Sequence, residues 1–243
     1  ILSVAAARAA ARVVHLGAVG EDGAWAVERM MEYGIDTRLI TTVDGPTGHA
    51  IILVDRAGEN SIVLHPGANH LISEDLMGQA LSEADTGDYL LLQNETLLQR
   101  EAVTMARDLG LKVAYAAAPF DAAAVEAVLP YVSMLVLNQV EAAQLAEATG
   151  LPIERVDVDS VVVTRGGDGA EWLMRGRDPM TAAAYTVPVV DTTGAGDCFI
   201  GTLAAALDAG LSEDLALRAA LAAGALQVTR RGTADVMPDR AEV

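Results

Sequence analysis

The stretch Val190–Leu207, VDTTGAGDCFIGTLAAAL, decides the fold class of this 243-residue chain. A β-type run, Tyr185–Val190, leads into a turn of small residues, and an Ala-rich helix follows the turn. The Gly194–Gly196 segment leaves backbone N–H groups uncovered where the helix begins, and such a turn binds anions. Asp197 places a carboxylate beside that turn. This combination suits phosphoryl transfer, in which the acid takes a proton from an attacking hydroxyl, although an ordinary Gly-rich turn with an acidic helix start gives the same pattern.

Helix-like and strand-like segments alternate along most of the chain, which predicts an α/β fold with a mostly parallel sheet and helices on both faces. The predicted strands are Arg12–Gly17, Tyr89–Gln93, Lys112–Ala116, Met134–Leu137 and Ser160–Thr164, with Glu171–Arg175 and Tyr185–Val190 as antiparallel additions. The predicted helices are Ser3–Ala11, Asp22–Tyr33, Ser73–Ala84, Leu98–Leu109, Ala122–Val128, Val140–Thr149, Asp197–Ala209 and Ser212–Thr229.

Two β-rich runs, Thr47–Asp55 and Asn60–Leu64, differ from this alternation. A turn at Arg56–Glu59 joins them, which predicts a hairpin. We expect residues 1–243 to form a single domain in which this hairpin, residues 47–66, is a small lid over the site.

The composition excludes several classes of partner. The net charge of −18 argues against nucleic acid and against an anionic membrane surface. No apolar run is long enough to span a bilayer. Cys198 is the single cysteine, so an internal disulfide is impossible and a reducing cytoplasm is the expected location. We expect Cys198 to be a small core residue.

The run from Asp191 to Asp197 resembles the second signature of the ribokinase-like (PfkB) family of carbohydrate kinases, DTxGAGD, and Phe199 and Gly201 continue the match. Other family motifs come in the same order, and the resemblance extends from about Arg12 to the C-terminus. NQVEA, from Asn138, resembles the family's NxxE motif; TRGGDG, from Thr164, resembles its nucleotide loop TxGxxG; GENSIVLHPGAN, Gly58–Asn69, resembles the ribokinase branch.

The resemblance implies a role for each matching residue. Asp197 would be the general base and would contact the acceptor, while the amides of Gly194, Ala195 and Gly196 would stabilise charge on the transferred group. ATP and Mg²⁺ would be held by Asn138, Glu141 (through water), Thr164, Gly166, Gly169 and Gly196. Glu95 would bind sugar hydroxyls. The structural alternatives are a helix cap at Asn138, a hairpin turn at the TRGGDG loop and a solvated loop at Glu95.

A monovalent-cation site is also implied, in which K⁺ would be held mostly by backbone carbonyls. Its residues would be Asp191, Thr193, Gln227, Arg230, Gly232 and Val236.

The chain departs from the family pattern in two places. Family members begin with a strand that carries an acceptor-binding Asp, two lid strands and a Gly-Gly motif, and Ile1 follows the expected place of that motif. A further helix is usual where this chain has only the link between Gly150 and Ser160. We expect segments absent from the numbering at both places, with a truncated and inactive protein as the alternative.

The resemblance favours an ATP-dependent kinase that phosphorylates a primary hydroxyl of a small sugar, with ribose as the expected acceptor. A sugar acid of the 2-keto-3-deoxygluconate type or a nucleoside is the alternative acceptor, and a non-catalytic binding protein is the alternative function. An exposed edge of the lid would favour pairing of two copies, so a homodimer is expected.

Overall fold

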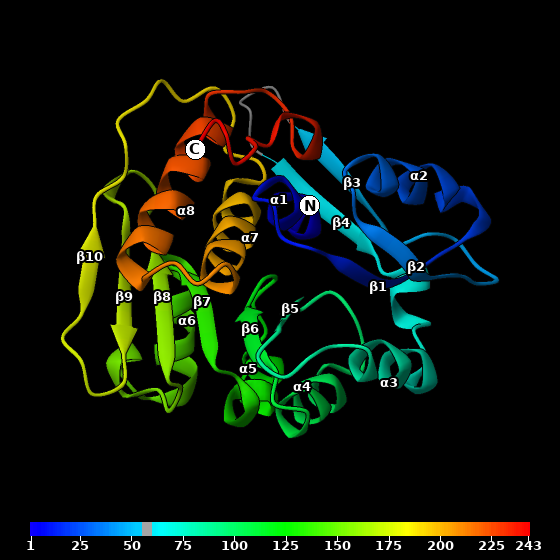
Figure 1. Cartoon of the computed structure of the whole chain (residues 1–243), viewed down its shortest axis with the longest axis horizontal. Coiled ribbons are helices and arrows are strands. Elements are labelled where there is room, and N and C mark those ends of the chain that lie inside the picture. Colours follow the sequence, from blue (N-terminus) through cyan, green and yellow to red (C-terminus); the bar gives the residue numbers. More distant parts are fainter. Residues whose placement is uncertain (55–59) are drawn as a thin grey trace.

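The structure is a computed structural model that describes residues 1–54 and 60–243. Its centre is a six-stranded sheet in the order β10-β9-β8-β7-β6-β5 (Figure 1). Four of these strands are parallel: β5 (Tyr89–Gln93), β6 (Lys112–Ala116), β7 (Met134–Asn138) and β8 (Ser160–Thr164). The two others, β9 (Ala170–Met174) and β10 (Met180–Ala182), are antiparallel.

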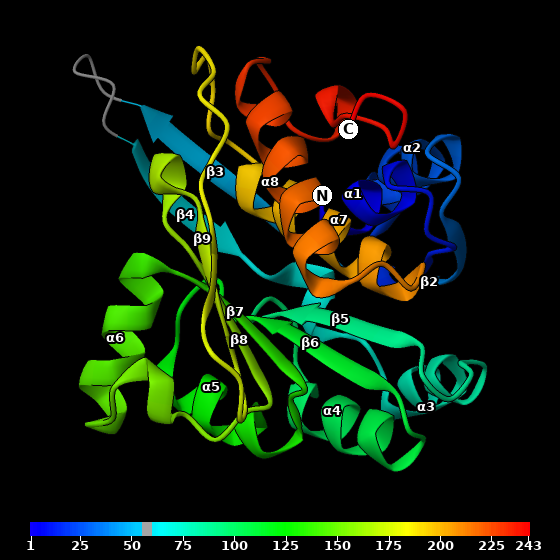
Figure 2. The ribbon, with the colours of Figure 1, turned by 60° about the vertical axis from the view of Figure 1, so that its left-hand side comes forward.

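Helices cover both faces of this sheet, as the alternation in the sequence predicts (Figure 2). One face carries α3 (Glu74–Ser82), α4 (Gln99–Asp108), α5 (Ala122–Val128) and α6 (Gln139–Thr149); the other carries α7 (Ala195–Asp208) and α8 (Glu213–Val228). Strand β7 shows why the strands are apolar throughout. Leu135 and Leu137 enter the core on the first face, while Met134 and Val136 enter the core on the second.

The N-terminal helix α1 (Leu2–Arg8) packs against α7. Cys198 is buried there in a third core cluster with Val4 and Ala5, which confirms it as a core residue. Beyond α1, β1 (Val14–Val19) and β2 (Asp36–Thr42) form a separate parallel pair, with α2 (Ala24–Glu32) between them along the chain.

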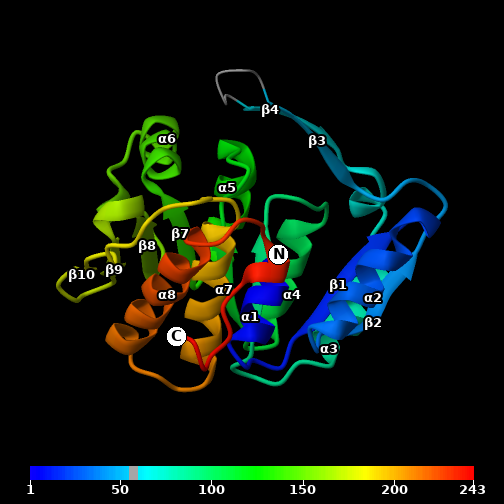
Figure 3. The ribbon, with the colours of Figure 1, turned by 90° about the horizontal axis from the view of Figure 1, so that it is seen from above.

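The predicted hairpin is present as β3 (His49–Val54) and β4 (Asn60–His65), paired from His49 with His65 to Val54 with Asn60. These two strands form their own sheet and extend away from the body of the molecule (Figure 3). The predicted turn Arg56–Glu59 and the end of the first run at Asp55 lie outside the described residues.

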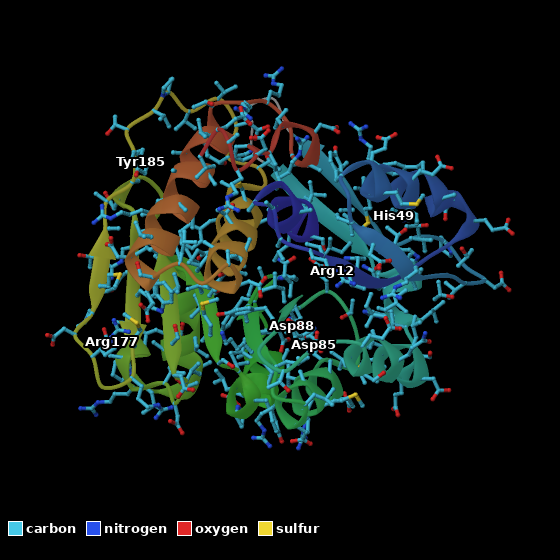
Figure 4. The ribbon with its side chains drawn as sticks, in the orientation of Figure 1. Arg12, His49, Asp85, Asp88, Arg177 and Tyr185 are labelled. Carbon is cyan, nitrogen blue, oxygen red and sulfur yellow. The ribbon has the colours of Figure 1, made fainter. Side chains whose placement is uncertain are left out.

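The prediction of a strand at Tyr185–Val190 is wrong. Among the described residues this segment pairs with no strand, and Tyr185 lies on the surface above β10, in the stretch of chain that leads from β10 to α7 (Figure 4). Pro188 removes one backbone donor from the run. The amides of Val190 and Asp191 instead donate to the carbonyl of Val228, at 2.7 and 3.2 Å, so the segment is tied to the end of α8.

Strand β2 was not predicted, because its sequence, DTRLITT, buries only Leu39 and lacks a strong apolar pattern. The link from Gly150 to Ser160 contains the short helix η4 (Ile153–Arg155) and joins α6 to β8 directly. Val158 of this link is buried in the core.

The remaining short 3₁₀ helices are η1 (Glu21–Gly23), η2 (Gly67–His70), η3 (Leu129–Tyr131), η5 (Gly166–Asp168) and η6 (Ala234–Val236). Within the described ranges, every helix is too short or too polar to cross a membrane.

Candidate active site

Asp197 lies where the carboxyl end of β5 meets the start of α7. Gln93, the last residue of β5, donates from Nε2 to Oδ1 of Asp197 across 3.2 Å. Ligands of open α/β sheets bind at the carboxyl ends of parallel strands, so this contact places the acid at the expected edge.

The turn before α7 has the features of an anion-binding site. Gly194 precedes the helix with a φ of +75°, a conformation that glycine adopts without strain. The amides of Gly196 and Asp197 belong to the first helical turn, which has no preceding turn of carbonyls to accept from them. Among the described residues outside this helix turn, none has an atom within 4 Å of a Cβ placed at Gly196, so the space beside Gly196 is open. The amide of Ala195, by contrast, donates to the carbonyl of Thr192 across 3.2 Å.

Two carboxylates at this edge, Asp197 and Glu95, have raised pKa values. Burial raises the pKa of Asp197, and the hydrogen bond from Gln93 opposes that rise. The pKa of Glu95, which follows β5, is raised by partial burial and also by the charge of Asp197. Because a raised pKa strengthens a carboxylate as a base, Asp197 can accept a proton from a hydroxyl that is placed beside it.

Asn138 and Glu141 form a capping box at the start of α6. Oδ1 of Asn138 accepts from the amides of Val140 and Glu141, at 2.8 and 2.9 Å, and Oε2 of Glu141 accepts from the amide of Asn138 at 2.8 Å. The helix cap that the sequence analysis gives as the alternative role of Asn138 is therefore present. Burial raises the pKa of Glu141, and its other carboxylate oxygen is not part of the box.

We expect Asn138→Ala to lower the free energy of unfolding by about 1 kcal/mol, because two helix amides lose their acceptor. Chemical denaturation in the absence of ligands measures this. The matched variant Asn138→Asp keeps an oxygen acceptor at a helix N-terminus and should retain the stability of the original chain. Equal stability of the Ala variant and the original chain would contradict the capping role.

The loop Thr164–Gly169 turns β8 into the antiparallel strand β9, so it is a hairpin connection. Thr164 lies beside Asn138 in the register of β7 and β8, and its Oγ1 donates to the carbonyl of Leu137 across 3.4 Å. The two motifs that the sequence assigns to ATP therefore lie side by side at one edge of the sheet. Gly166 and Gly169 have φ values of +53° and +103°.

The residues expected to bind a monovalent cation also come together. Oδ1 of Asp191 accepts from the amide and the hydroxyl of Thr193, at 2.9 and 2.6 Å, and its Oδ2 accepts from the amide of Gly232 at 3.2 Å. These hydrogen bonds lower the pKa of Asp191, and the one from the Thr193 hydroxyl has the largest effect. Asp191 thereby joins the anion-binding turn to the loop that follows α8.

Sequence reasoning named Gln227 for a site built mostly of backbone carbonyls and did not predict a role for its side chain. It is fully buried, and its amide lies among three carbonyl oxygens. A polar residue in the otherwise apolar second part of α8, AALAAGALQV, was the available signal. Arg230 was named for this site, but its side-chain contact was not predicted: its guanidinium Nη1 donates to the carbonyl of Val236 across 2.9 Å.

The chain matches the pfkB family of carbohydrate kinases over residues 2–240. Ribokinase from Haemophilus influenzae is 33% identical over 255 residues, which cover 99% of this chain and 83% of that protein. The crystal structure of ribokinase from Cryptococcus neoformans var. grubii serotype A in complex with ADP superposes with a TM-score of 0.87 at 30% identity, covering 99% of this chain and 84% of that one. Ribokinase from Arabidopsis thaliana, complexed with ribose and ATP, gives a TM-score of 0.85 at 25% identity over 99% of this chain and 83% of that one.

Proposed function

Because the chain belongs to the pfkB family of carbohydrate kinases, and is thus an ATP-dependent sugar kinase, we propose that its acceptor is ribose. The observation that carries the proposal is Asp197. It is a carboxylate of raised pKa in the first turn of α7, beside an open anion-binding turn and next to Glu95. Ribokinase from Haemophilus influenzae and ribokinase from Arabidopsis thaliana, the latter complexed with ribose and ATP, are among the similar proteins.

In this proposal, Asp197 takes the proton of a primary hydroxyl of the sugar. The hydroxyl oxygen then bonds to the γ-phosphorus of ATP, and the bond from that phosphorus to the bridging oxygen breaks, which releases ADP. The open amides of Gly196 and Asp197 face the transferred group and stabilise its charge, together with the dipole of α7. Gln93 holds the carboxylate of Asp197 in place through Nε2.

Mg²⁺ would be held by the phosphates of ATP and, through water, by the oxygen of Glu141 that the capping box leaves unused. A single carboxylate suits this ion, which keeps most of its waters when it binds. When bound, it would neutralise phosphate charge. Thr164, beside Asn138, and the glycines of the following loop would hold the nucleotide.

We expect Glu95→Gln to raise the KM for ribose about tenfold, or about 1.4 kcal/mol, since a charged acceptor for sugar hydroxyls becomes neutral. The KM for ATP should not change. Steady-state kinetics with each substrate varied in turn measures both values, and Glu101→Gln, an exposed acid on α4, is the matched control. A rise in both KM values, or in neither, would contradict the assignment of Glu95 to the sugar.

The test of the proposed function is the release of ADP from MgATP across a panel of sugars, sugar acids and nucleosides. Turnover that depends on ribose supports the proposal. Turnover only with a 2-keto-3-deoxygluconate-type acid or a nucleoside would keep the mechanism and refute ribose as the acceptor. ATP binding without turnover on any acceptor would favour a binding protein, although such a protein has no physical need for an acid beside its anion-binding turn.

A homodimer formed through the β3–β4 hairpin is also part of the proposal. In the part of the chain that the structure describes, β3 and β4 pair only with each other, and Ile51, Leu53, Val63 and Leu64 are each more than half exposed. A second copy would cover this apolar surface. The molar mass in solution, measured by light scattering, tests this: a monomer at micromolar concentration would refute it. The cytoplasmic location, which rests on the single cysteine, stays a prediction.

A further inference from the structure

Gln227, in the last turn of α8, has a fully buried side chain with an unusual set of partners. Its Nε2 lies 3.0 Å from the carbonyl oxygen of Gly232, 3.3 Å from that of Thr193 and 3.4 Å from that of Thr233. Burying an amide is costly unless its hydrogens find acceptors. Here three acceptors surround the two hydrogens, so the N–H₂ group is well satisfied.

The three carbonyls come from two separate segments. Thr193 belongs to the anion-binding turn before α7, whereas Gly232 and Thr233 belong to the loop that follows α8. Carbonyl oxygens that converge from different loops repel one another unless a positive group lies between them. A hard cation is one such group, and the N–H₂ of an amide is another.

The other oxygens expected to bind the cation also have donors within the chain. Both carboxylate oxygens of Asp191 accept from Thr193 and Gly232. The backbone carbonyl of Gln227 accepts from the amide of Arg230 at 3.1 Å, and the carbonyl of Val236 accepts from the Arg230 guanidinium. The side chain of Val236 has no oxygen to offer. Each of these oxygens keeps a further lone pair, but the N–H₂ of Gln227 already lies among the three carbonyls of Thr193, Gly232 and Thr233. The arrangement present therefore does not fit a K⁺ bound among those carbonyls.

We propose that the side-chain amide of Gln227 takes the place of a monovalent cation, so that this kinase works without K⁺. The inference rests on the proposed function, because it concerns how the anion-binding turn is held for catalysis. Gln227 is then a positioning residue: it joins the Thr193 end of the turn to the C-terminal loop and touches no substrate.

The orientation of the amide follows from the same contacts. Among the described residues, Oε1 of Gln227 is buried without a hydrogen-bond partner. A flipped amide would bring this oxygen against the three carbonyls and would need a cation between them. K⁺ should therefore stabilise the protein if the amide is flipped and should have no effect if the N–H₂ faces the carbonyls. This difference can be measured without any substrate.

The experiment compares the thermal unfolding midpoint in KCl and in tetramethylammonium chloride at equal ionic strength. The original chain should give the same midpoint in both salts. Gln227→Ala opens the carbonyl cluster, and Gln227→Glu replaces the donors by a carboxylate. Both variants should be more stable in KCl by at least about 2 °C, a shift of the size that a bound ligand gives in a domain of this length. Gln144→Ala, on the exposed side of α6, is the control and should show no difference.

Turnover with ribose gives the second readout. The original chain should have equal rates in the two salts, and Gln227→Ala should lose about tenfold in rate when K⁺ is replaced. A midpoint of the original chain that rises in KCl would overturn the inference, even if neither variant folds. The inference would also be overturned if the original chain and a folded Gln227→Ala variant each had the same midpoint in the two salts. The carbonyl cluster would then bind no cation even without the Gln227 amide. The midpoints remain informative if no acceptor is phosphorylated, so failure of the proposed function is seen separately.

Discussion

Asp197→Asn lowers kcat by about 10²–10⁴-fold, the range expected when a general base is lost. The amide has nearly the shape of the carboxylate and can still contact Gln93, but it cannot take a proton from the sugar hydroxyl. The affinity for ATP should stay the same or increase, because the substitution removes a negative charge from the neighbourhood of the phosphates. Initial rates and calorimetric titration with MgATP measure the two effects separately.

Asp208→Asn is the matched control, since Asp208 is an exposed acid at the other end of the same helix. It should keep full activity. An Asp197→Asn enzyme that turns over at close to the original rate would refute Asp197 as the base. Loss of ATP binding together with loss of rate would show instead that the anion-binding turn had collapsed.

The pH dependence gives a further readout of the same prediction. The base must be ionised to act, so kcat/KM should fall as the pH falls through the pKa of Asp197. Burial raises that pKa, which places the acid limb at higher pH than for an ordinary aspartate. Glu95 is coupled to Asp197, so the limb reports the pair. In Asp197→Asn the residual activity should lose the contribution of Asp197 to this limb and keep only that of Glu95.

The sequence predicts an element well where residues close together in the chain are enough to define it. Strands β5, β6 and β8 and helix α5 have the predicted bounds, because an apolar run or a capped helix defines each of them. The segment Tyr185–Val190 has the residues of a strand, but its amides reach α8 instead of a neighbouring strand. Strand pairing depends on residues far apart in the chain, which a local pattern does not contain.

The candidate site shows the same limit at the level of side chains. DTTGAGD predicts the place of Asp197, and the structure brings Gln93 and Asp197 together from residues 104 apart in the chain. The partners of the Gln227 amide were not predictable, because its three acceptors come from other segments. The motif at Asn138 fits two roles that the sequence alone does not distinguish. A helix cap and an ATP contact require the same Asn and Glu at the same spacing.

A substitution at Gly169 is expected to cause a large loss of stability, because its backbone conformation and its surroundings both exclude a side chain. Its φ of +103° and ψ of −136° lie in a region that only glycine adopts readily. A Cβ there would lie 2.0 Å from the carbonyl oxygen of Ala182, at the end of β10, and 2.8 Å from two further backbone atoms. The backbone conformation costs about 1–3 kcal/mol for a non-glycine residue, and forced overpacking costs about 1–3 kcal/mol more.

We therefore expect Gly169→Ala to lower the free energy of unfolding by about 2–6 kcal/mol, measured by chemical denaturation. Gly167→Ala is the matched control in the same loop. A Cβ at Gly167 meets no atom within 4 Å, so this substitution should be neutral or stabilise the chain by up to about 1 kcal/mol. Equal stability of the two variants would mean that the loop does not pack against the end of β10. A Gly169→Ala chain of normal stability that no longer binds ATP would assign this glycine to the nucleotide alone. Loss of stability without ATP present, by contrast, makes the approach to Ala182 the reason that a glycine is needed here.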